Sequence, residues 1–219
     1  MLTHPVDPSY TLIEPADLDR DPLPDLVRAH EAPLRAVVTW AREYLCRPHP
    51  ELGRSGNVCP YAATALDRGT FLLTVQPGAD PDRPQTAQRL AGYRDWFRDL
   101  ATQAGNARIH HTILMLLPDL PPADASAVVD RLQRDLKSEY VAQGLMIGEF
   151  HAGPPDKAGL WNPQFRPLHS PVPILAIRHM VPTDYLFLQS DPEHVRVYLR
   201  LYGDQVPAHL RERISGTVS

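Results

Sequence analysis

Apolar residues recur along this chain with two different periods, and together these periods predict alternating helices and strands. Helical spacing appears in six segments, namely 33–45, 60–66, 85–103, 123–143, a stretch opened by Asp191-Pro-Glu, and 208–214. Short continuous apolar runs predict strands over 71–76, 108–117, 145–151 and 172–180. The unbroken apolar run in the second of these strands is typical of a central strand.

This order of elements predicts one α/β domain over 34–215, with helices packed on a mixed, partly parallel four-stranded sheet. Strand–helix–strand units make parallel neighbours through right-handed crossovers, so the first three strands should include parallel pairs. The fourth strand can run either way, because the long loop before it can span the sheet. An α+β arrangement stays open on the same pattern. Residues 1–33 hold six prolines and predict an extended arm, either packed over the domain or partly disordered.

The connector between the last two predicted strands, residues 152–171, carries most of the candidate chemistry. Its five prolines exclude both a helix and a central strand. It combines apolar anchors with amide, guanidinium, imidazole and hydroxyl groups, as small-molecule sites do. These residues are Trp161, Asn162, Phe165, Arg166, His169 and Ser170. We predict a cover that closes over a ligand, with Trp161 as its anchor. The alternative is a proline-rich wrap whose polar groups face water.

His151 ends the third predicted strand at the mouth of this loop. Ligands of open α/β sheets bind beyond the carboxyl ends of parallel strands, and alternation places Glu149 on the same face as His151. The position suits a metal or heme ligand, a general base or a group that hydrogen-bonds a substrate. A structural histidine is the alternative.

Two further pairs of residues are placed by the same alternation. Arg178 and His179 point to opposite faces of the fourth strand, so we expect one of them to share a pocket with His151 and Arg166. The pair at 110–111, both histidines, begins the second strand and should lie at the opposite rim of the sheet.

Cys59 precedes a proline that suits the first turn of a short helix. A thiol at a helix N-terminus ionises more readily, so Cys59 is a candidate reactive group or ligand. A buried cysteine that pins the turn is the alternative reading of the same residues.

Charge and composition exclude several classes of protein. The formal net charge is −4 and no cluster of Lys and Arg occurs, which disfavours nucleic-acid binding. No apolar run approaches the roughly 20 residues of a membrane span, and the N-terminus lacks the features of a signal peptide, so we expect a cytoplasmic protein. The two cysteines make neither a structural disulfide nor a zinc site. Glycine-rich phosphate loops and Gly-x-Ser-x-Gly elbows are missing as well.

Several short motifs resemble those of an uncharacterised domain family common in actinobacteria. They are Cys59-Pro-Tyr, Gly148-Glu-Phe-His, Asn162-Pro-Gln-Phe-Arg-Pro-Leu-His-Ser-Pro and Ile177-Arg-His-Met. The resemblance covers roughly residues 40 to 200, and it implies no activity because the family supplies none.

A more distant resemblance is to the heme-dependent N-hydroxylase family that includes the arginine-hydroxylating enzyme of guanitoxin biosynthesis. A Cys-Pro pair, a helix, an apolar strand and a Gly…His element follow in the same order in both. This chain departs from that pattern, with one extra residue between Gly148 and His151 and with Ala152 in place of proline. The resemblance implies heme as cofactor and His151 as the ligand of its iron.

The leading hypothesis is therefore a small heme-dependent oxygenase that acts on an amino-acid-like or other small nitrogenous metabolite, in secondary metabolism. His151 would ligate iron, the loop would exclude water, and Arg166 or Arg178 would hold a carboxylate. One rival is a non-catalytic small-molecule or heme-binding module, and another is a metal-free enzyme in which His151 and Glu149 do acid–base work. We expect a small-molecule partner, no nucleic acid and no membrane, and a homodimer stays open.

Overall fold

Four strands form the centre of the fold, in the order β3-β4-β6-β5. They are β3 (Phe71–Val75), β4 (Thr112–Leu116), β5 (Leu145–Phe150) and β6 (Ile174–His179). This arrangement comes from a computed structural model, which describes residues 1–155, 162, 165–206 and 214. β3 and β4 are parallel, and β6 is antiparallel to both of its neighbours. The carboxyl ends of β3, β4 and β5 therefore meet at one edge of the sheet, here called the carboxyl edge, and their starts form the amino edge.

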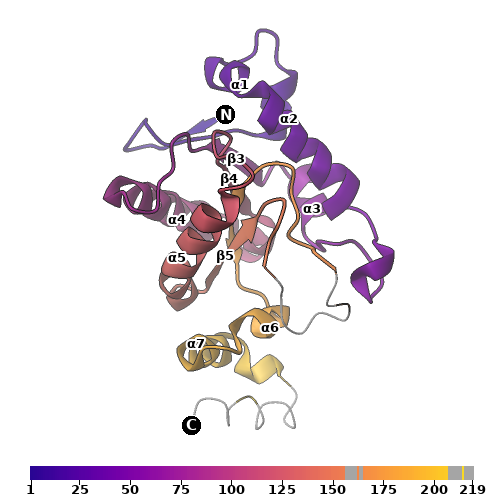
Figure 1. Ribbon diagram of the computed structural model, residues 1–219. Coiled ribbons are helices and arrows are strands. Elements are labelled where there is room, and N and C mark those ends of the chain that lie inside the picture. The colour runs from indigo at the N-terminus through magenta and orange to yellow at the C-terminus, as the bar shows by residue number, and fades with distance from the viewer. Residues whose placement is uncertain (156–161, 163–164, 207–213, 215–219) are drawn as a thin grey trace.

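Helices cover both faces of this sheet (Figure 1). α2 (Glu31–Trp40) and α3 (Ala62–Asp67) lie on one side, and α4 (Pro84–Ala104) and α5 (Arg131–Ala142) lie on the other. Single π-helical turns, η2 (Ala41–Leu45) and η5 (Ser126–Asp130), continue α2 and precede α5. The remaining short helical elements are η1 (Pro15–Asp19), α1 (Asp25–Ala29), η3 (Pro50–Leu52), η4 (Gly105–His110), η6 (Pro182–Asp184), α6 (Tyr185–Leu188) and η7 (Gly203–Gln205).

Strand alternation divides the core into two apolar layers. Leu73 and Leu114 face α2 and pack with Leu34 and Val37 from it. The intervening positions, such as Ile113, face the other way and pack against α4 and α5. The mixed, partly parallel four-stranded sheet with helices packed on it is thus confirmed.

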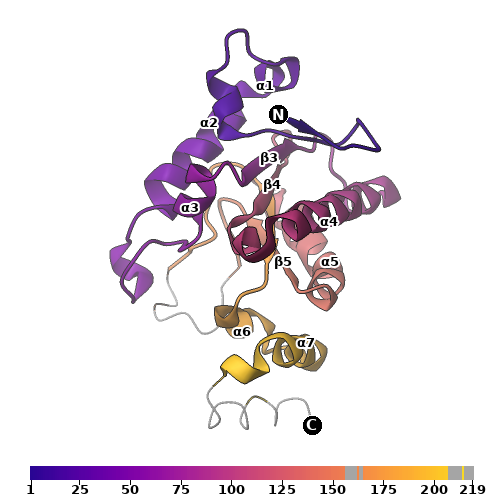
Figure 2. The same cartoon turned by 180° about the vertical axis from the view of Figure 1, so that it is seen from behind.

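The amino edge is covered by the last part of the chain. α6 and α7 (Pro192–Tyr202) lie beyond this edge and form a third apolar cluster with Met146 and Met180 (Figure 2). Asp191 caps α7, since its carboxylate accepts from the N–H groups of Glu193 and His194.

The N-terminal arm packs along the edge strand β3. β1 (Leu2–Thr3) and β2 (Thr11–Leu12) make a small antiparallel pair, and Ile13 then exchanges two backbone hydrogen bonds with Leu73, of 2.7 and 2.8 Å. Tyr10 lies directly over Gly92 of α4, where an added Cβ would come within 2.2 Å of the Tyr10 hydroxyl. The arm also contains α1, so it is not simply extended.

Some local expectations are corrected by the structure, and others concern residues outside the described part of the chain. The predicted strand over 108–117 begins only at Thr112, because Gly105, at a φ of 56°, ends α4 and the chain then makes the 3-10 helix η4. β5 does not pair with β4, since β6 lies between them. The predicted helix over 208–214 lies, apart from residue 214, outside the described residues, as does Trp161.

Candidate functional site

His151 lies just past β5 at the carboxyl edge, and both of its ring nitrogens are hydrogen-bonded. Nδ1 accepts from the Gly153 N–H at 3.1 Å, so the ring proton resides on Nε2, which donates to Asp130 Oδ1 at 2.9 Å. The side chain is only 2% exposed. The predicted position at the strand end is as expected, but the ring is fully engaged.

This geometry does not fit an axial heme ligand. A ligating imidazole needs a free lone pair, and here one nitrogen accepts from a backbone N–H while the other carries the proton. A hydrolytic triad does not fit either, because the Ser126 hydroxyl donates to Asp130 Oδ2, at 2.6 Å, and not to the histidine. Among the described residues, no group of three or more His, Cys, Asp or Glu side chains is placed to hold a metal ion.

Glu149 is buried on the same face of β5, two residues before His151. The pair therefore lies between the sheet and the α4/α5 layer, where solvent has little access. Acid–base chemistry by Glu149 and His151 stays a prediction.

Arg178 and His179 lie at the other end of the sheet. Because β6 is antiparallel, Arg178 pairs with Thr112 and Met146, the early residues of β4 and β5. The expectation that one of them shares a pocket with His151 and Arg166 is therefore wrong.

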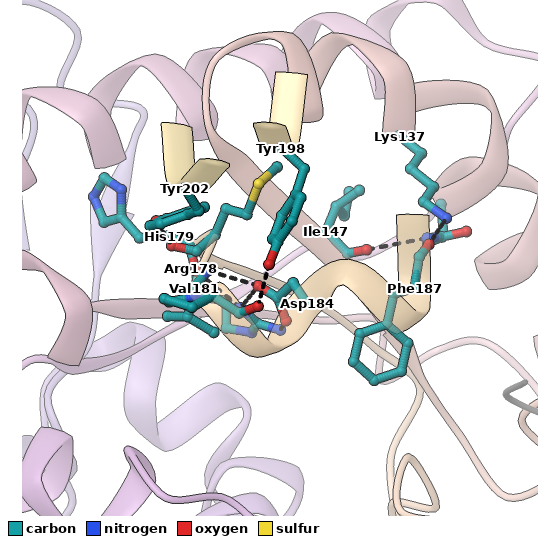
Figure 3. A network of polar contacts seen from close by, with 12 residues as sticks. Lys137, Ile147, Arg178, His179, Val181, Asp184, Phe187, Tyr198 and Tyr202 are labelled. Atoms are coloured by element: carbon teal, nitrogen blue, oxygen red, sulfur yellow. Dashed lines mark hydrogen bonds and ion pairs between the residues drawn. The ribbon is translucent and has the colours of Figure 1, made fainter. Parts of the chain in front are cut away.

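Arg178 forms a partly buried ion pair with the buried Asp184 at this amino edge (Figure 3). Its guanidinium binds both oxygens of Asp184, at 2.7 and 2.6 Å, and Asp184 also accepts from the Val181 N–H at 2.8 Å. Tyr198 donates to the Pro182 carbonyl at 2.7 Å beside it. The bidentate pair joins β6 to η6, directly before α6, which is a structural role.

His179 occupies the same edge on the α4 side, with its ring 5.1 Å from that of Phe97. Burial lowers the pKa of His179 to about 4, and the neighbouring Arg108 and His111 add to this shift. Its Nε2 is buried without a hydrogen-bond partner in the described part of the chain. His179 is thus held neutral at pH 7.

Cys59 is a partly buried free thiol near the amino edge, in electrostatic contact with Arg178 and Tyr61. α3 begins at Ala62, so Cys59 precedes the helix and does not open it. Since His151 lies at the carboxyl edge, the structure does not bring these two predicted cofactor ligands together.

The described part of the long loop closes one side of a pocket at the carboxyl edge. The backbone carbonyl of Asn162 accepts from the Phe165 N–H at 3.1 Å, and His169 forms an isolated parallel β-bridge with His151. Ser170 is buried and donates to the Val172 carbonyl at 2.5 Å. These hydrogen bonds and the β-bridge fix the path by which the loop returns to the sheet.

This pocket has a volume of about 360 Å³ and a largely aromatic lining, and we call it the aromatic pocket. It is lined by Trp40, Tyr44, His49, Glu51, Phe165, Arg166 and His169. The Phe165 and His49 rings lie 4.8 Å apart, Tyr44 and His49 6.0 Å, and Trp40 and Tyr44 6.2 Å. The Tyr44 hydroxyl donates to the Arg166 carbonyl at 3.3 Å, which connects η2 to the loop.

Three of the predicted loop residues, Phe165, Arg166 and His169, line this pocket. The other wall of the pocket is not predicted from the sequence. Tyr44 lies inside the predicted helical segment 33–45, and His49 follows shortly after it. The signal that was present is a run of aromatic residues at a helix end, directly before a proline turn.

Comparison with known proteins places the chain in a family. A family model described as a domain of unknown function, DUF6875, matches residues 34–213. The chain belongs to this family. The DUF6875 domain includes the aromatic pocket and both edges of the sheet, and its match bears out the resemblance to an uncharacterised family. No curated protein and no solved structure matches the chain, and the comparisons do not support the likeness to heme-dependent N-hydroxylases. Within the described residues, no helix is both long and apolar enough to cross a membrane.

Proposed function

We propose that the aromatic pocket binds a small, positively charged nitrogenous molecule of the amino-acid type. The observation that carries this proposal is the set of three aromatic side chains, Trp40, Tyr44 and Phe165, around one pocket, with Glu51 in the same lining. Aromatic faces attract cations through their quadrupole, by about 0.5–2 kcal/mol for each favourable contact. A carboxylate beside them adds a second attraction for the same charge.

Arg166 gives the pocket a second kind of recognition. Arg166 belongs to the lining that also holds Glu51, so a positively charged and a negatively charged residue both border the space. A ligand with an ammonium or guanidinium group and a carboxylate matches this arrangement.

Two imidazole side chains, those of His49 and His169, also line the aromatic pocket. His49 is oriented by its neighbour, because its Nδ1 accepts from the Glu51 N–H at 3.2 Å. His169 lies at the exposed rim. Both imidazoles can donate or accept a hydrogen bond with a bound ligand.

Heme-dependent oxidation of such a ligand stays a separate prediction of the sequence resemblance. A visible absorption spectrum of the purified protein tests it. A Soret band that disappears in His151→Ala would require His151 to leave Asp130 and Gly153, and it would overturn the assignment of this ring as structural.

Calorimetric titration with L-lysine and L-arginine tests the proposed pocket, with norleucine as the uncharged counterpart. We expect the cationic amino acids to bind more tightly than norleucine. Tyr44→Leu and Phe165→Leu keep apolar volume but remove the aromatic face, so each should weaken lysine binding about tenfold, the equivalent of about 1.4 kcal/mol. Glu51→Gln should weaken it about threefold and reduce its dependence on salt.

Phe150→Leu is the matched control. Phe150 packs against Trp40 at 5.8 Å but is not part of the pocket lining. Lysine affinity should be close to that of the parent in this variant. Equal losses in Phe150→Leu and Phe165→Leu, or equal binding of lysine and norleucine, would contradict the proposal.

A further inference from the structure

A second pocket, of about 340 Å³, opens where the parallel strands β3 and β4 end. Its apolar floor is formed by Val75, Leu117 and Leu175, and Leu132 of α5 closes one side. β3, α4 and β4 form a parallel strand–helix–strand unit, and ligands of such units bind at this end of the strands. The location is therefore favourable on topology alone, and it is separate from the aromatic pocket.

One wall of this second pocket has a positive electrostatic potential, which comes from the N-terminus of α4 and from Arg89. α4 has 21 residues and starts with Pro84, and within the described residues no side chain caps its N-terminus. Gln85 and Thr86 of this first turn belong to the lining. The Thr86 N–H donates to the Arg83 carbonyl at 2.9 Å and Pro84 has no N–H, so the Gln85 N–H and the helix dipole are the features of this turn that favour an anion.

Arg89 adds a full charge to the same wall. In the described part of the chain its guanidinium donates to neutral oxygens only, to Ser9 Oγ at 2.9 Å and to the Ser9 carbonyl and the Tyr93 hydroxyl, and it lies 4.0 Å over the Tyr10 ring. Asp7 is within electrostatic range but forms no ion pair with it. By contrast, Arg83 in the same lining is paired with Asp80 at 3.2 Å.

Gln76 is the independent observation that points to a ligand. This side chain is only 8% exposed, and it lines the pocket directly after β3. Its Nε2 donates to Thr74 Oγ1 at 3.2 Å, which in turn donates to the Tyr93 hydroxyl at 2.8 Å. The amide oxygen has no hydrogen-bond partner among the described residues. Because this oxygen still contacts solvent, a ligand hydroxyl that enters the pocket can donate to it in place of water.

We infer that this pocket binds a small hydroxycarboxylic acid with an apolar tail. The carboxylate would lie between Arg89 and the first turn of α4, and the hydroxyl would donate to Gln76. The tail would lie on the leucine floor. This assignment is independent of the aromatic pocket, because the two linings share no residue.

An NMR titration of the full-length protein with 2-hydroxyhexanoate tests the inference. Saturable shifts are expected at the backbone amides of Gln76, Gly78 and Thr86. Hexanamide, which lacks the charge, should bind at least tenfold more weakly. Hexanoate, which lacks the hydroxyl, should bind about threefold more weakly, and Gln76→Leu should abolish this threefold preference while hexanoate still binds.

Two variants separate the pocket from the stability of the arm. Arg89→Gln should weaken 2-hydroxyhexanoate at least tenfold, but it also alters the contact with Ser9. Ala79→Trp fills the pocket lining without touching that contact, and it should abolish the saturable shifts. Ala87→Trp, on an exposed part of α4 outside the lining, is its control and should bind like the parent. Shifts that do not saturate, that survive Ala79→Trp, or that centre on Tyr44 and Phe165 would overturn the assignment.

Discussion

His151 and His179 lie at opposite edges of one sheet, on the face that packs against α4 and α5, and the protein treats them differently. At the carboxyl edge, His151 is 2% exposed but both ring nitrogens have partners. At the amino edge, His179 has a buried nitrogen without a partner in the described part of the chain, and burial lowers its pKa to about 4. Burial alone therefore does not decide whether a histidine ring is hydrogen-bonded. The donors and acceptors that surround the ring decide it.

The two edges also differ in where they place charge. The amino edge buries Asp184 against Arg178, and the carboxyl edge surrounds its two pockets with side chains that remain partly in solvent. A buried ion pair holds elements together, whereas partly solvated charges can exchange water for a ligand. This contrast makes the amino edge the structural end of the sheet, and the carboxyl edge is the end at which we propose that ligands bind.

The largest expected effect tests the structural end. Asp184→Ala leaves the Arg178 charge without its partner and removes the acceptor of the Val181 N–H. We expect the free energy of unfolding to fall by about 3 kcal/mol, at the lower end for a broken buried pair because Arg178 keeps 31% of its side chain exposed. Urea denaturation measures it. Glu193→Ala, which removes an exposed ion pair with Arg196, should cost less than about 1 kcal/mol. Similar losses in both variants would remove the distinction between the edges.

The second effect is a pH dependence that originates at His179. Its folded pKa is about 4, below the value near 6.5 of an unfolded histidine, so the unfolded state binds more protons between these values. Stability should be complete above pH 6.5 and should fall on acidification towards pH 4. The expected loss is about 2 kcal/mol, less than the full linkage value because solvent still reaches part of the ring.

His179→Leu is the variant that isolates this contribution. Denaturation midpoints measured between pH 4 and pH 7 should depend on pH less steeply in the variant than in the parent. The slope does not vanish, because burial also lowers the pKa values of His111 and His194. Parallel curves for parent and variant would show that His179 does not titrate as described.

The smallest expected change in stability tests the hydrogen bond between His151 and Asp130. Asp130→Ala leaves the buried Nε2–H of His151 without an acceptor, which should cost about 1–2 kcal/mol. Asp135→Ala, one turn later and exposed, removes only a surface contact with Arg131 and should cost less than about 0.5 kcal/mol. If both variants unfold at the same denaturant concentration, the contact between His151 and Asp130 does not stabilise the fold.

Much of the fold follows from local pattern, and the order of the strands does not. The apolar repeats of α2 and α4 and the continuous runs of the strands predict these elements to within a few residues. Nothing in the run at 174–179 specifies that it pairs with both β4 and β5, because any strand that is buried on both faces reads alike. The error over Arg178 and His179 has this origin, since their location depends on the direction of β6.

The candidate site was predictable only on one side. Phe165, Arg166 and His169 belong to a loop whose composition marks it. Tyr44 and His49 gain their role only through a contact with residues about 120 positions later, which no local pattern carries. The partners of His151 are similar, because Asp130 reaches it from a π-helical turn that the periodicity did not predict.

The insertion of β6 between β4 and β5 has a consequence for how the chain folds during synthesis. β6 is the last strand in the sequence, and it is the only partner of β5 in the described sheet. Until residues 174–179 leave the ribosome, β4 and β5 each expose an unpaired edge, the kind of surface through which nascent chains aggregate. Completion of the sheet is therefore a late and long-range step, which slows folding compared with a sheet built from consecutive strands. A chain that ends before β6 would contain most of the sequence of this domain, but β5 would remain unpaired.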